Sequence, residues 1–319
     1  MDALSEILKS MKLRHVALGT MHLGSGWGLS VSNFDAPTAY GLAEGPACWI
    51  RVGGRAPQLL AQGDLALFPR GRSYAMSCGP DTPCDDLGVA WAANGLPAFS
   101  PDSEPAVPLR FVWGGPGPAT RLLSMAFGMA GGRSNPLLAA LPDVIILRHE
   151  RNGTFPWLRP SLDFLSTQEA GSPGFAATAR LLVELVFVSI VRSHLIDEPR
   201  ATRGWLRGLT DRQVGLALQA MHAAPGADWT LATLAKKAGL SRTALATRFG
   251  ALVETTPIQY LTDWRMHLAA VSILQERPHL GQLAYELGYT SDAAFRDAFK
   301  RRYGVPPSRY AQAAQQPAT

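Results

Sequence analysis

Residues 231–249 read LATLAKKAGLSRTALATRF, and residues 280–299 repeat the same pattern as LGQLAYELGYTSDAAFRDAF. Each copy begins with apolar residues at positions i, i+3, i+4 and i+7, which is the spacing of one face of an α-helix. A glycine follows, Gly239 or Gly288, and then a serine and a second, shorter apolar helix pattern. Two helices joined by a tight turn form a helix-turn-helix motif, whose second helix enters the major groove of DNA. The pattern therefore predicts two such motifs, at about residues 229–250 and 279–302.

The second helix of the first copy is expected to begin at Ser241, whose side chain can cap it. Leu245 and Phe249 lie four residues apart and are expected to pack inward. The positions left to face DNA are Arg242, Thr243, Ala246 and Thr247. An arginine there can pair with guanine O6 and N7, whereas Arg248, near the helix end, is better placed for a phosphate.

The second copy predicts its recognition helix over residues 291–301, with Phe295 and Phe299 inward. The residues expected at DNA are Ser291, Asp292, Arg296, Lys300 and Arg301. The basic end of this helix suits contacts with the phosphate backbone. Two roles stay open for Asp292: it can stabilise the helix dipole, or it can accept a hydrogen bond from cytosine. We expect the first motif to read bases and the second to anchor the backbone.

A long helix is predicted between the two copies. Thr256 and Pro257 form a helix start, and the apolar pattern then runs to about Glu276, before Pro278. About 20 residues give a rod of roughly 30 Å, close to the 34 Å of one DNA turn. Such a rod would hold two recognition helices in successive major grooves.

The charge of the chain favours the same interpretation. From Trp205 onward, 13 Lys and Arg stand against 8 Asp and Glu, which accounts for the whole net charge of +5. A local basic excess is what binding to phosphates requires. The N-terminus lacks a basic and apolar leader pattern, no apolar run is long enough for a membrane helix, and the three cysteines have no metal-site spacing. We therefore expect a cytoplasmic protein with no membrane contact.

The first part of the chain predicts short strands at residues 28–34, 47–52, 58–61, 64–68 and about 109–113, separated by Gly and Pro turns. Such a pattern is typical of a β-sandwich or β-barrel. Helices are predicted at 157–168, 175–195 and 206–223, and a linker at 197–204. The apolar stripe of 175–195 is too wide for one buried face, so this is either a core helix or a helix that contacts a second subunit. The expected domains are 1–200 and 205–319, in an α+β chain.

Several segments resemble the AraC/XylS transcription regulators. They are residues 234–241, Arg248-Phe249, 256–261, Trp264-Arg265-Met266, 287–289 and 299–307. The resemblance implies a bacterial regulator of promoter DNA, usually an activator that contacts RNA polymerase, and a homodimer. Asp297 departs from the family, which commonly has a basic residue there. Residues 63–71 resemble the cupin-like effector domain that precedes many such regulators, so the N-terminal barrel is expected to bind a small molecule and to dimerise.

No enzymatic or metal site is predicted. Metal-binding cupins carry histidines on the barrel strands, whereas Tyr40 and Tyr74 stand where relatives often have His. His15 and His22 have no carboxylate partner at ligand spacing, and no Ser/His/Asp or Cys/His set is evident. We expect no cofactor and no catalysis; the alternative is a cupin enzyme tethered to DNA.

The effector is the least defined part of the prediction. Arg51 and Arg55 form an R-x-x-x-R pattern that can clamp phosphates or bind guanine, similar to one motif of cyclic di-GMP receptors. With Arg70 nearby, and Tyr40 and Tyr74 in the barrel, cyclic di-GMP is the leading specific ligand. The competing interpretation is a solvated hairpin with charged flanks. A different input would be oxidation of Cys78 and Cys84, which lie in one Gly/Pro-rich loop.

Overall fold

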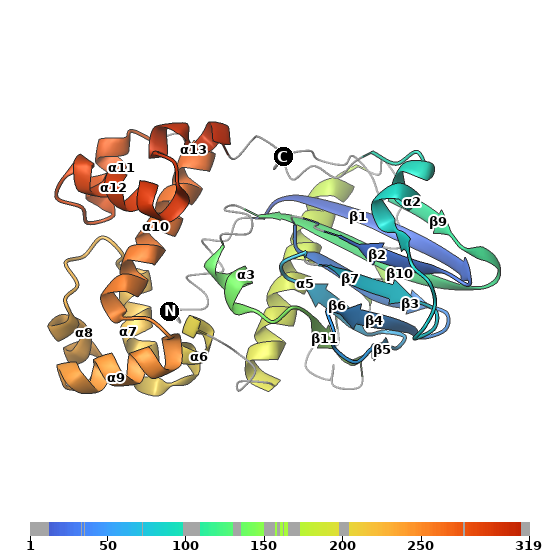
Figure 1. Ribbon diagram of the computed structural model, residues 1–319, viewed down its shortest axis with the longest axis horizontal. Helices are drawn as coiled ribbons and strands as arrows, with labels where there is room; N and C mark the ends of the chain where they lie inside the picture. The colour runs from blue at the N-terminus through green and yellow to red at the C-terminus, as the bar shows by residue number, and fades with distance from the viewer. Residues whose placement is uncertain are drawn as a thin grey trace. The chain divides into compact units, whose positions relative to one another are not determined.

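The structure is a computed structural model of the 319-residue chain. It describes residues 13–97 apart from 33, 35 and 72; 109–129; 135–149; 157, 160–161 and 163–164; 173–197; and 204–313 apart from 277. The described residues form two compact units (Figure 1). The N-terminal unit contains Leu13–Arg133 and Leu141–Glu198, and the C-terminal unit contains Ser134–Ala140 and Pro199–Thr319. A short piece from the middle of the chain thus belongs to the C-terminal unit.

The N-terminal unit is built on two β-sheets. One has six strands in the order β11-β6-β3-β10-β1-β9, and the other has five in the order β5-β4-β7-β2-β8. The longest ladder is antiparallel and joins β1 to β10, from Leu13 opposite Met129 to Ser25 opposite Gly115. The strands are β1 (Leu13–Ser25), β2 (Gly28–Val31), β3 (Thr38–Glu44), β4 (Cys48–Val52), β5 (Gln58–Leu60), β6 (Leu65–Phe68), β7 (Tyr74–Ser77), β8 (Asp85–Asp86), β9 (Leu109–Trp113), β10 (Gly115–Met129) and β11 (Ile145–Leu147).

Both sheets contribute to one hydrophobic core, so they pack face to face. The core includes Ile50 from the five-stranded sheet and Phe68, Phe111 and Leu122 from the six-stranded sheet, all of them essentially inaccessible. Alternation explains which side chains enter it, because successive residues of a strand point to opposite faces. In β4, for example, Cys48, Ile50 and Val52 are buried while the residues between them are only half-buried.

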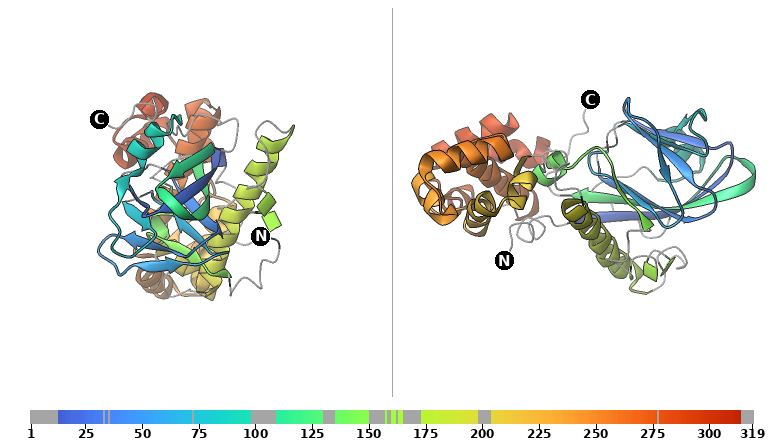
Figure 2. Two further views of the ribbon diagram at one scale, coloured as in Figure 1. Left: turned by 90° about the vertical axis from the view of Figure 1, so that its right-hand side faces the viewer. Right: turned by 90° about the horizontal axis from the view of Figure 1, so that it is seen from below.

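Helix α5 (Phe175–Asp197) runs along the six-stranded sheet (Figure 2). Phe187 of this helix packs against Phe127 of β10, with 5.4 Å between ring centroids. On the other side of the helix, Leu181 and Leu185 are 59% and 45% exposed. The helix therefore has one face in the core and one apolar face in solvent. The unit also contains α2 (Leu87–Ala93), which is capped by Asp86.

The C-terminal unit is helical. Its elements are α3 (Pro136–Ala140), α6 (Gly204–Thr210), α7 (Arg212–Ala223), α8 (Leu231–Ala238), α9 (Arg242–Val253), α10 (Pro257–Glu276), α11 (Leu280–Glu286), α12 (Asp292–Tyr303) and α13 (Pro307–Ala313). The two helix-turn-helix motifs are α8–α9 and α11–α12, and α10 joins them (Figure 1). Gly239 ends α8 with φ of 67°, a left-handed conformation that glycine adopts without strain. The α+β organisation expected from the sequence is confirmed.

Several elements differ from the sequence prediction. The elements that were not predicted are the strands β1, β3, β7, β8, β10 and β11 and the helices α2, α3 and α13. Strand β10 begins with Gly115-Pro116-Gly117-Pro118, which disrupts any strand pattern, and its ladder with β1 compensates. The helix predicted at 206–223 is two helices. The break falls at Asp211, whose carboxylate accepts hydrogen bonds from the backbone of Gln213 and Val214 and so caps α7. Most of the helix predicted at 157–168 and most of the linker lie outside the described residues.

Candidate functional site

Helix α9 presents the expected side chains of the first motif to solvent. Ser241 caps the helix by accepting a hydrogen bond from the Ala244 backbone at 3.2 Å, and Leu245 and Phe249 are fully buried. Arg242, Thr243 and Thr247 are exposed, and Ala246 is half-buried. Within the described part of the chain, the Arg242 side chain has no hydrogen-bond or ion-pair partner, so its guanidinium remains available for a base edge.

Arg248 is engaged within the protein. Its Nε and Nη2 donate to one carboxylate oxygen of Asp211, at 2.9 and 2.6 Å. Partial burial alone would raise the pKa of Asp211, but the hydrogen bonds from Arg248 and from the backbone outweigh it and hold that pKa below its usual value. The same contact raises the pKa of Arg248. Arg248 therefore ties α9 to the start of α7, and its phosphate contact stays a prediction.

In the second motif, Ser291 caps α12 through the Ala294 backbone, and Phe295 and Phe299 are buried. Asp292 pairs with Arg296 one turn later, at 2.6 Å between Oδ2 and Nη2. This ion pair was not predicted from the sequence. It gives Asp292 a third role, besides stabilising the helix dipole and accepting a hydrogen bond from cytosine. Lys300 and Arg301 are exposed at the end of the helix, as the basic pattern predicts.

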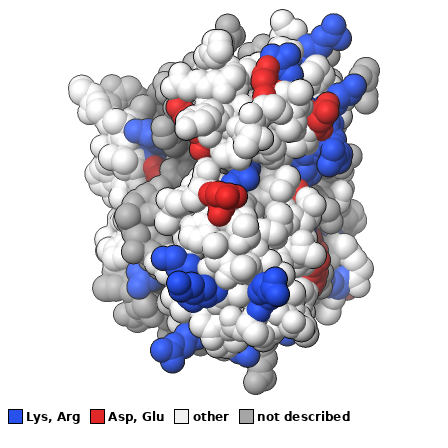
Figure 3. Space-filling view, turned by 90° about the vertical axis from the view of Figure 1, so that its left-hand side faces the viewer, with Lys and Arg blue, Asp and Glu red and all other residues white. Residues whose placement is uncertain are grey.

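Both motifs carry exposed basic side chains, such as Lys236 and Arg242 in the first and Lys300 and Arg301 in the second. In the space-filling view of Figure 3, Lys and Arg side chains gather toward the top right and near the bottom, with mostly uncharged surface between them and acidic side chains among the upper group. Two separated basic areas suit two contacts with a phosphate backbone.

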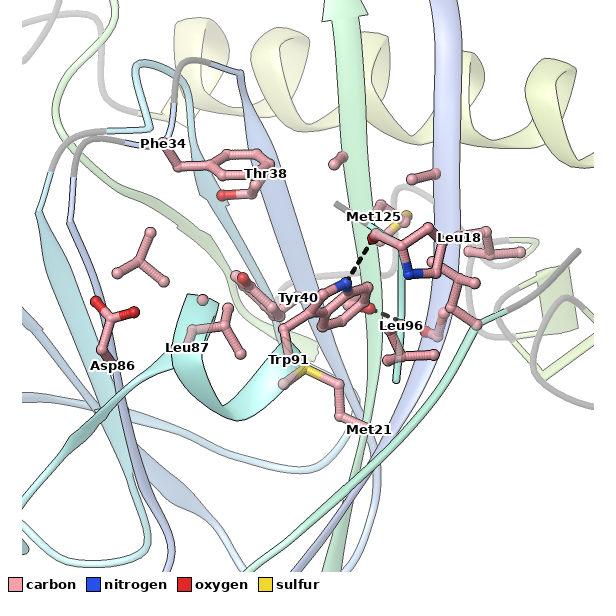
Figure 4. A pocket seen from close by; sticks show the side chains of 18 of the residues that line it. Leu18, Met21, Phe34, Thr38, Tyr40, Asp86, Leu87, Trp91, Leu96 and Met125 are labelled. Atoms are coloured by element: carbon pink, nitrogen blue, oxygen red, sulfur yellow. Dashed lines mark hydrogen bonds between the residues drawn. The ribbon is translucent and has the colours of Figure 1, made fainter. Parts of the chain in front are cut away.

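The N-terminal unit contains a partly open cavity of about 570 Å³ between its sheets and α2. The walls are mainly apolar: Leu18 and Met21 from β1, Trp91 from α2, and Met125 from β10. In Figure 4, Tyr40, Trp91 and Met125 converge from three different elements, while Asp86 lies to one side. Clefts of this size with apolar walls and a few polar groups are typical small-molecule sites.

The polar groups of the lining include Ser32, Asp86, Ser124 and a chain of three hydroxyl groups. The Tyr74 hydroxyl lies 2.9 Å from that of Tyr40 and 3.0 Å from that of Thr38. Burial raises the pKa of Tyr40 to about 12 and raises that of Tyr74 well above its usual value. Both phenols are therefore neutral at physiological pH. Tyr74 also stacks on Phe68 at 3.7 Å between centroids, which fixes its ring.

The three arginines predicted at the ligand site do not line this cavity. Arg51 donates to the carbonyl oxygens of Pro80 and Thr82 and to Sγ of Cys84. Arg70 and Arg55 both approach Asp143, at 2.5 and 3.6 Å. The structure therefore brings Tyr40 and Tyr74 together at the cavity but not the three arginines, and a ligand role for the arginines stays a prediction. The reason is the alternation of β4: Ile50 and Val52 point into the core, so Arg51 lies on the opposite face.

The other cavity residues, such as Thr38, Trp91 and Met125, escaped the sequence reasoning. They lie on β3, α2 and β10, and no motif links these segments. Cys78 and Cys84 are free thiols that both contact Thr82, and Cys48 is buried. Among the described residues, no three His, Cys, Asp or Glu side chains are grouped as a metal site would require. In the same part of the chain, no helix has the length and apolar character needed to cross a membrane.

Comparison with known proteins agrees with both units. Residues 2–196 match the model of a cupin family, and residues 234–313 match that of a helix-turn-helix domain family. A putative AraC-like transcription regulator of Streptomyces lividans is 32% identical over 97% of this chain and 98% of its own length. The HTH-type transcriptional regulator AlkR of Acinetobacter baylyi is 30% identical over 98% of this chain and 99% of its own length.

Among solved structures, a DNA-binding transcriptional dual regulator of Escherichia coli K-12 is 26% identical over 33% of this chain and 96% of its own, with a TM-score of 0.31. The two family matches and the full-length relatives lead to one conclusion. The chain belongs to the AraC-like family of DNA-binding transcription regulators and carries a cupin domain ahead of its helix-turn-helix domain.

Proposed function

We propose that this regulator is controlled by a neutral, mainly apolar small molecule that binds in the cavity of the cupin domain. The observation that carries the proposal is the cavity of about 570 Å³, whose described lining contains aromatic and aliphatic side chains and three linked hydroxyls but no Lys or Arg. Apolar area removed from water supplies the affinity, at about 25 cal/mol per Å².

The charge of the ligand follows from the lining. Asp86 is the only ionisable carboxylate or base among the described lining residues, and both phenols stay neutral. An anion would leave water without meeting a cation, which is unfavourable. Cyclic di-GMP is for this reason a weaker candidate than a neutral, mainly apolar ligand, and the test below includes it as a probe.

The hydroxyl chain favours a single polar group on the ligand. Thr38, Tyr74 and Tyr40 carry three hydroxyl protons, and the two hydrogen bonds between them use two. One hydroxyl proton is therefore left to donate, and the hydroxyl oxygens can still accept hydrogen bonds. A ligand with one hydroxyl or carbonyl group would form a hydrogen bond with this chain. That bond matters because a buried polar group without a partner costs about 1–3 kcal/mol.

A matched series of probes tests the proposal on the full chain. Long-chain alcohols of about ten to eighteen carbons are compared with the carboxylates of equal length and with cyclic di-GMP, by thermal shift. A ligand at 100 times its Kd stabilises by about 2.7 kcal/mol, so a rise of several degrees is expected for the alcohols only. Tyr74→Phe should reduce that shift, whereas Arg51→Ala should not. A shift with cyclic di-GMP that Arg51→Ala abolishes would contradict the proposal.

Control of DNA binding requires a connection to the C-terminal unit. Support comes from the chain path: β10 lines the cavity through Ser124 and Met125, and α3, the next helix along the chain, belongs to the C-terminal unit. We propose that ligand binding alters β10 and thereby α3. In this scheme Arg242 on α9 reads bases and Lys300 and Arg301 on α12 hold phosphates, in an activator that contacts RNA polymerase as is usual for the family.

We also propose that the regulator is a homodimer joined through α5. Support comes from Leu181 and Leu185, one helical turn apart and exposed, on a helix whose other face is already buried. The double substitution Leu181→Asp, Leu185→Asp should give a monomer in sedimentation experiments at micromolar concentration. Arg180→Asp, which introduces the same residue at a neighbouring exposed position, should leave the dimer intact.

Oxidation is a second candidate input. Arg51 holds the loop that carries both thiols, and its Nη2 lies 3.0 Å from Sγ of Cys84. Oxidation of Cys78 or Cys84 would disturb that loop, which leads into Asp86 and α2 at the cavity. DNA binding by the Cys78→Ser, Cys84→Ser protein should then lose its response to hydrogen peroxide; an equal response in both proteins would exclude this input.

A further inference from the structure

The second helix-turn-helix motif lies against the loop that precedes the first motif, with backbone close to backbone. Gly226 lies in the loop before α8, and Gly288 lies in the turn between α11 and α12. A Cβ atom added to Gly226 would collide with the Glu286 carbonyl oxygen, and one added to Gly288 would lie 2.5 Å from the Gly226 carbonyl oxygen. Gly288 also has φ of 78°, which other residues rarely adopt. Only glycine at both positions permits this approach.

Arg265 of α10 connects the same two segments. Its Nε donates to the Pro225 carbonyl oxygen at 2.7 Å and its Nη2 to that of Ala227 at 2.8 Å, both in the loop before α8. On the other side, its guanidinium lies 5.9 Å from the ring centroid of Tyr289 in the second motif. One side chain of the connecting helix thus contacts both the loop that leads into the first motif and the second motif. We call Gly226, Arg265, Gly288 and Tyr289 the inter-motif contact.

Elsewhere the motifs use separate parts of α10. The first packs on its early residues, where Tyr260 meets Phe249 with centroids 5.8 Å apart. The second forms its own core with Met266, Ala270 and Ile273. A helix of 20 residues, roughly 30 Å, carries these two cores one after the other. Arg265 lies at the boundary between these two cores along α10.

We propose that Arg265 is a positioning residue that fixes the mutual orientation of α9 and α12 and so makes the protein select one spacing between its two DNA half-sites. The reason is the geometry of DNA, in which each base pair adds roughly 34° of rotation and 3.4 Å of rise. If the two recognition helices are held rigidly, an extra base pair between the half-sites prevents both from binding at once. If they are held loosely, the second helix can reorient to reach its displaced half-site. The proposal rests on DNA contact by both motifs and does not depend on the ligand.

The experiment uses the full chain and an operator selected from random DNA. Scrambling each half-site separately first establishes whether both motifs contact DNA. Affinity is then measured with one base pair inserted or deleted between the half-sites. The wild type should lose at least about 10-fold with either change. Arg265→Ala should bind every spacing within about 3-fold, with its half-site preferences kept.

Two comparisons make the result specific. Arg309→Ala, an exposed arginine on α13, should keep the wild-type spacing profile. Gly288→Ala should broaden the profile as Arg265→Ala does, and circular dichroism establishes that each variant is folded. Equal profiles for the wild type and a folded Arg265→Ala protein would overturn the proposal, as would a wild type indifferent to spacing. If scrambling the second half-site has no effect on the wild type, the DNA role of α12 fails instead.

Discussion

The indole Nε1 of Trp205 donates a hydrogen bond to the carbonyl oxygen of Pro136 across 3.1 Å, although the two residues lie 69 positions apart in the sequence. Trp205 is only 5% exposed, and its ring centroid lies 6.0 Å from that of His222. His222 in turn stacks on Trp264 of α10 at 4.3 Å. The start of α3 is thus attached to the side chains that support the connecting helix.

Trp205→Phe should release α3 while keeping an aromatic ring in place. Loss of one hydrogen bond costs about 0.5–1.5 kcal/mol, so amide hydrogen exchange in residues 137–140 should become several-fold faster. Trp229→Phe is the matched control, because its Nε1 makes a similar bond to the Ala224 carbonyl oxygen at 2.8 Å, away from α3. Unchanged exchange in the Trp205 variant would mean that this bond does not hold α3.

Arg242→Ala should weaken binding to the specific operator by about 1–3 kcal/mol and relax the preference at one base pair. Binding to random DNA should change little, because phosphate contacts dominate it. Arg296→Ala should weaken binding to the specific operator and to random DNA to a similar extent. Competition assays with specific and random DNA distinguish the two patterns; a uniform loss for Arg242→Ala would remove its role in base recognition.

Arg248→Ala should lower the melting temperature of the DNA-binding unit even without DNA, because the guanidinium is bound to Asp211. Asp211→Ala removes the partner and also the cap of α7, so it should lower the melting temperature further. Arg242→Ala is the control, since it changes an exposed arginine of the same helix. An Arg248→Ala protein as stable as the wild type would indicate that Arg248 contributes to DNA binding and not to the fold.

Acid should destabilise the DNA-binding unit through two buried histidines. Burial lowers the pKa of His222 to about 3 and that of His267 to about 4. The unfolded chain binds these protons near pH 6.5, so the stability is fully present above that pH and is lost as pH falls toward the folded-state values. At pH 5 the loss is about 1–2 kcal/mol for each histidine.

Urea denaturation between pH 7.5 and 4.5 measures this dependence. His267→Phe should flatten the curve, because it removes one of the two buried histidines. A wild-type curve that is already flat in this range would contradict the assigned protonation states.

The helix-turn-helix motifs were predictable because their signals are local. The spacing of Leu234, Ala235 and Ala238, the glycine in a left-handed turn and the serine caps each act within a few residues, and the chain folds as they indicate. The strands β1 and β10 had no such local signal, because they are stabilised by pairing with one another and with β9 and β3, which are distant in sequence.

The amino-acid sequence by itself determined the family, the two DNA-binding motifs and the helix between them, because periodicity and capping are short-range properties. The tertiary structure alone decided which residues line the cavity and which segments Arg265 contacts. Tyr40 and Trp91 meet in the cavity from separate elements, Arg51 lies on the outer face of its strand, and Arg265 reaches two segments that are distant in sequence. Such meetings depend on how strands and helices pack, which no single stretch of the chain specifies.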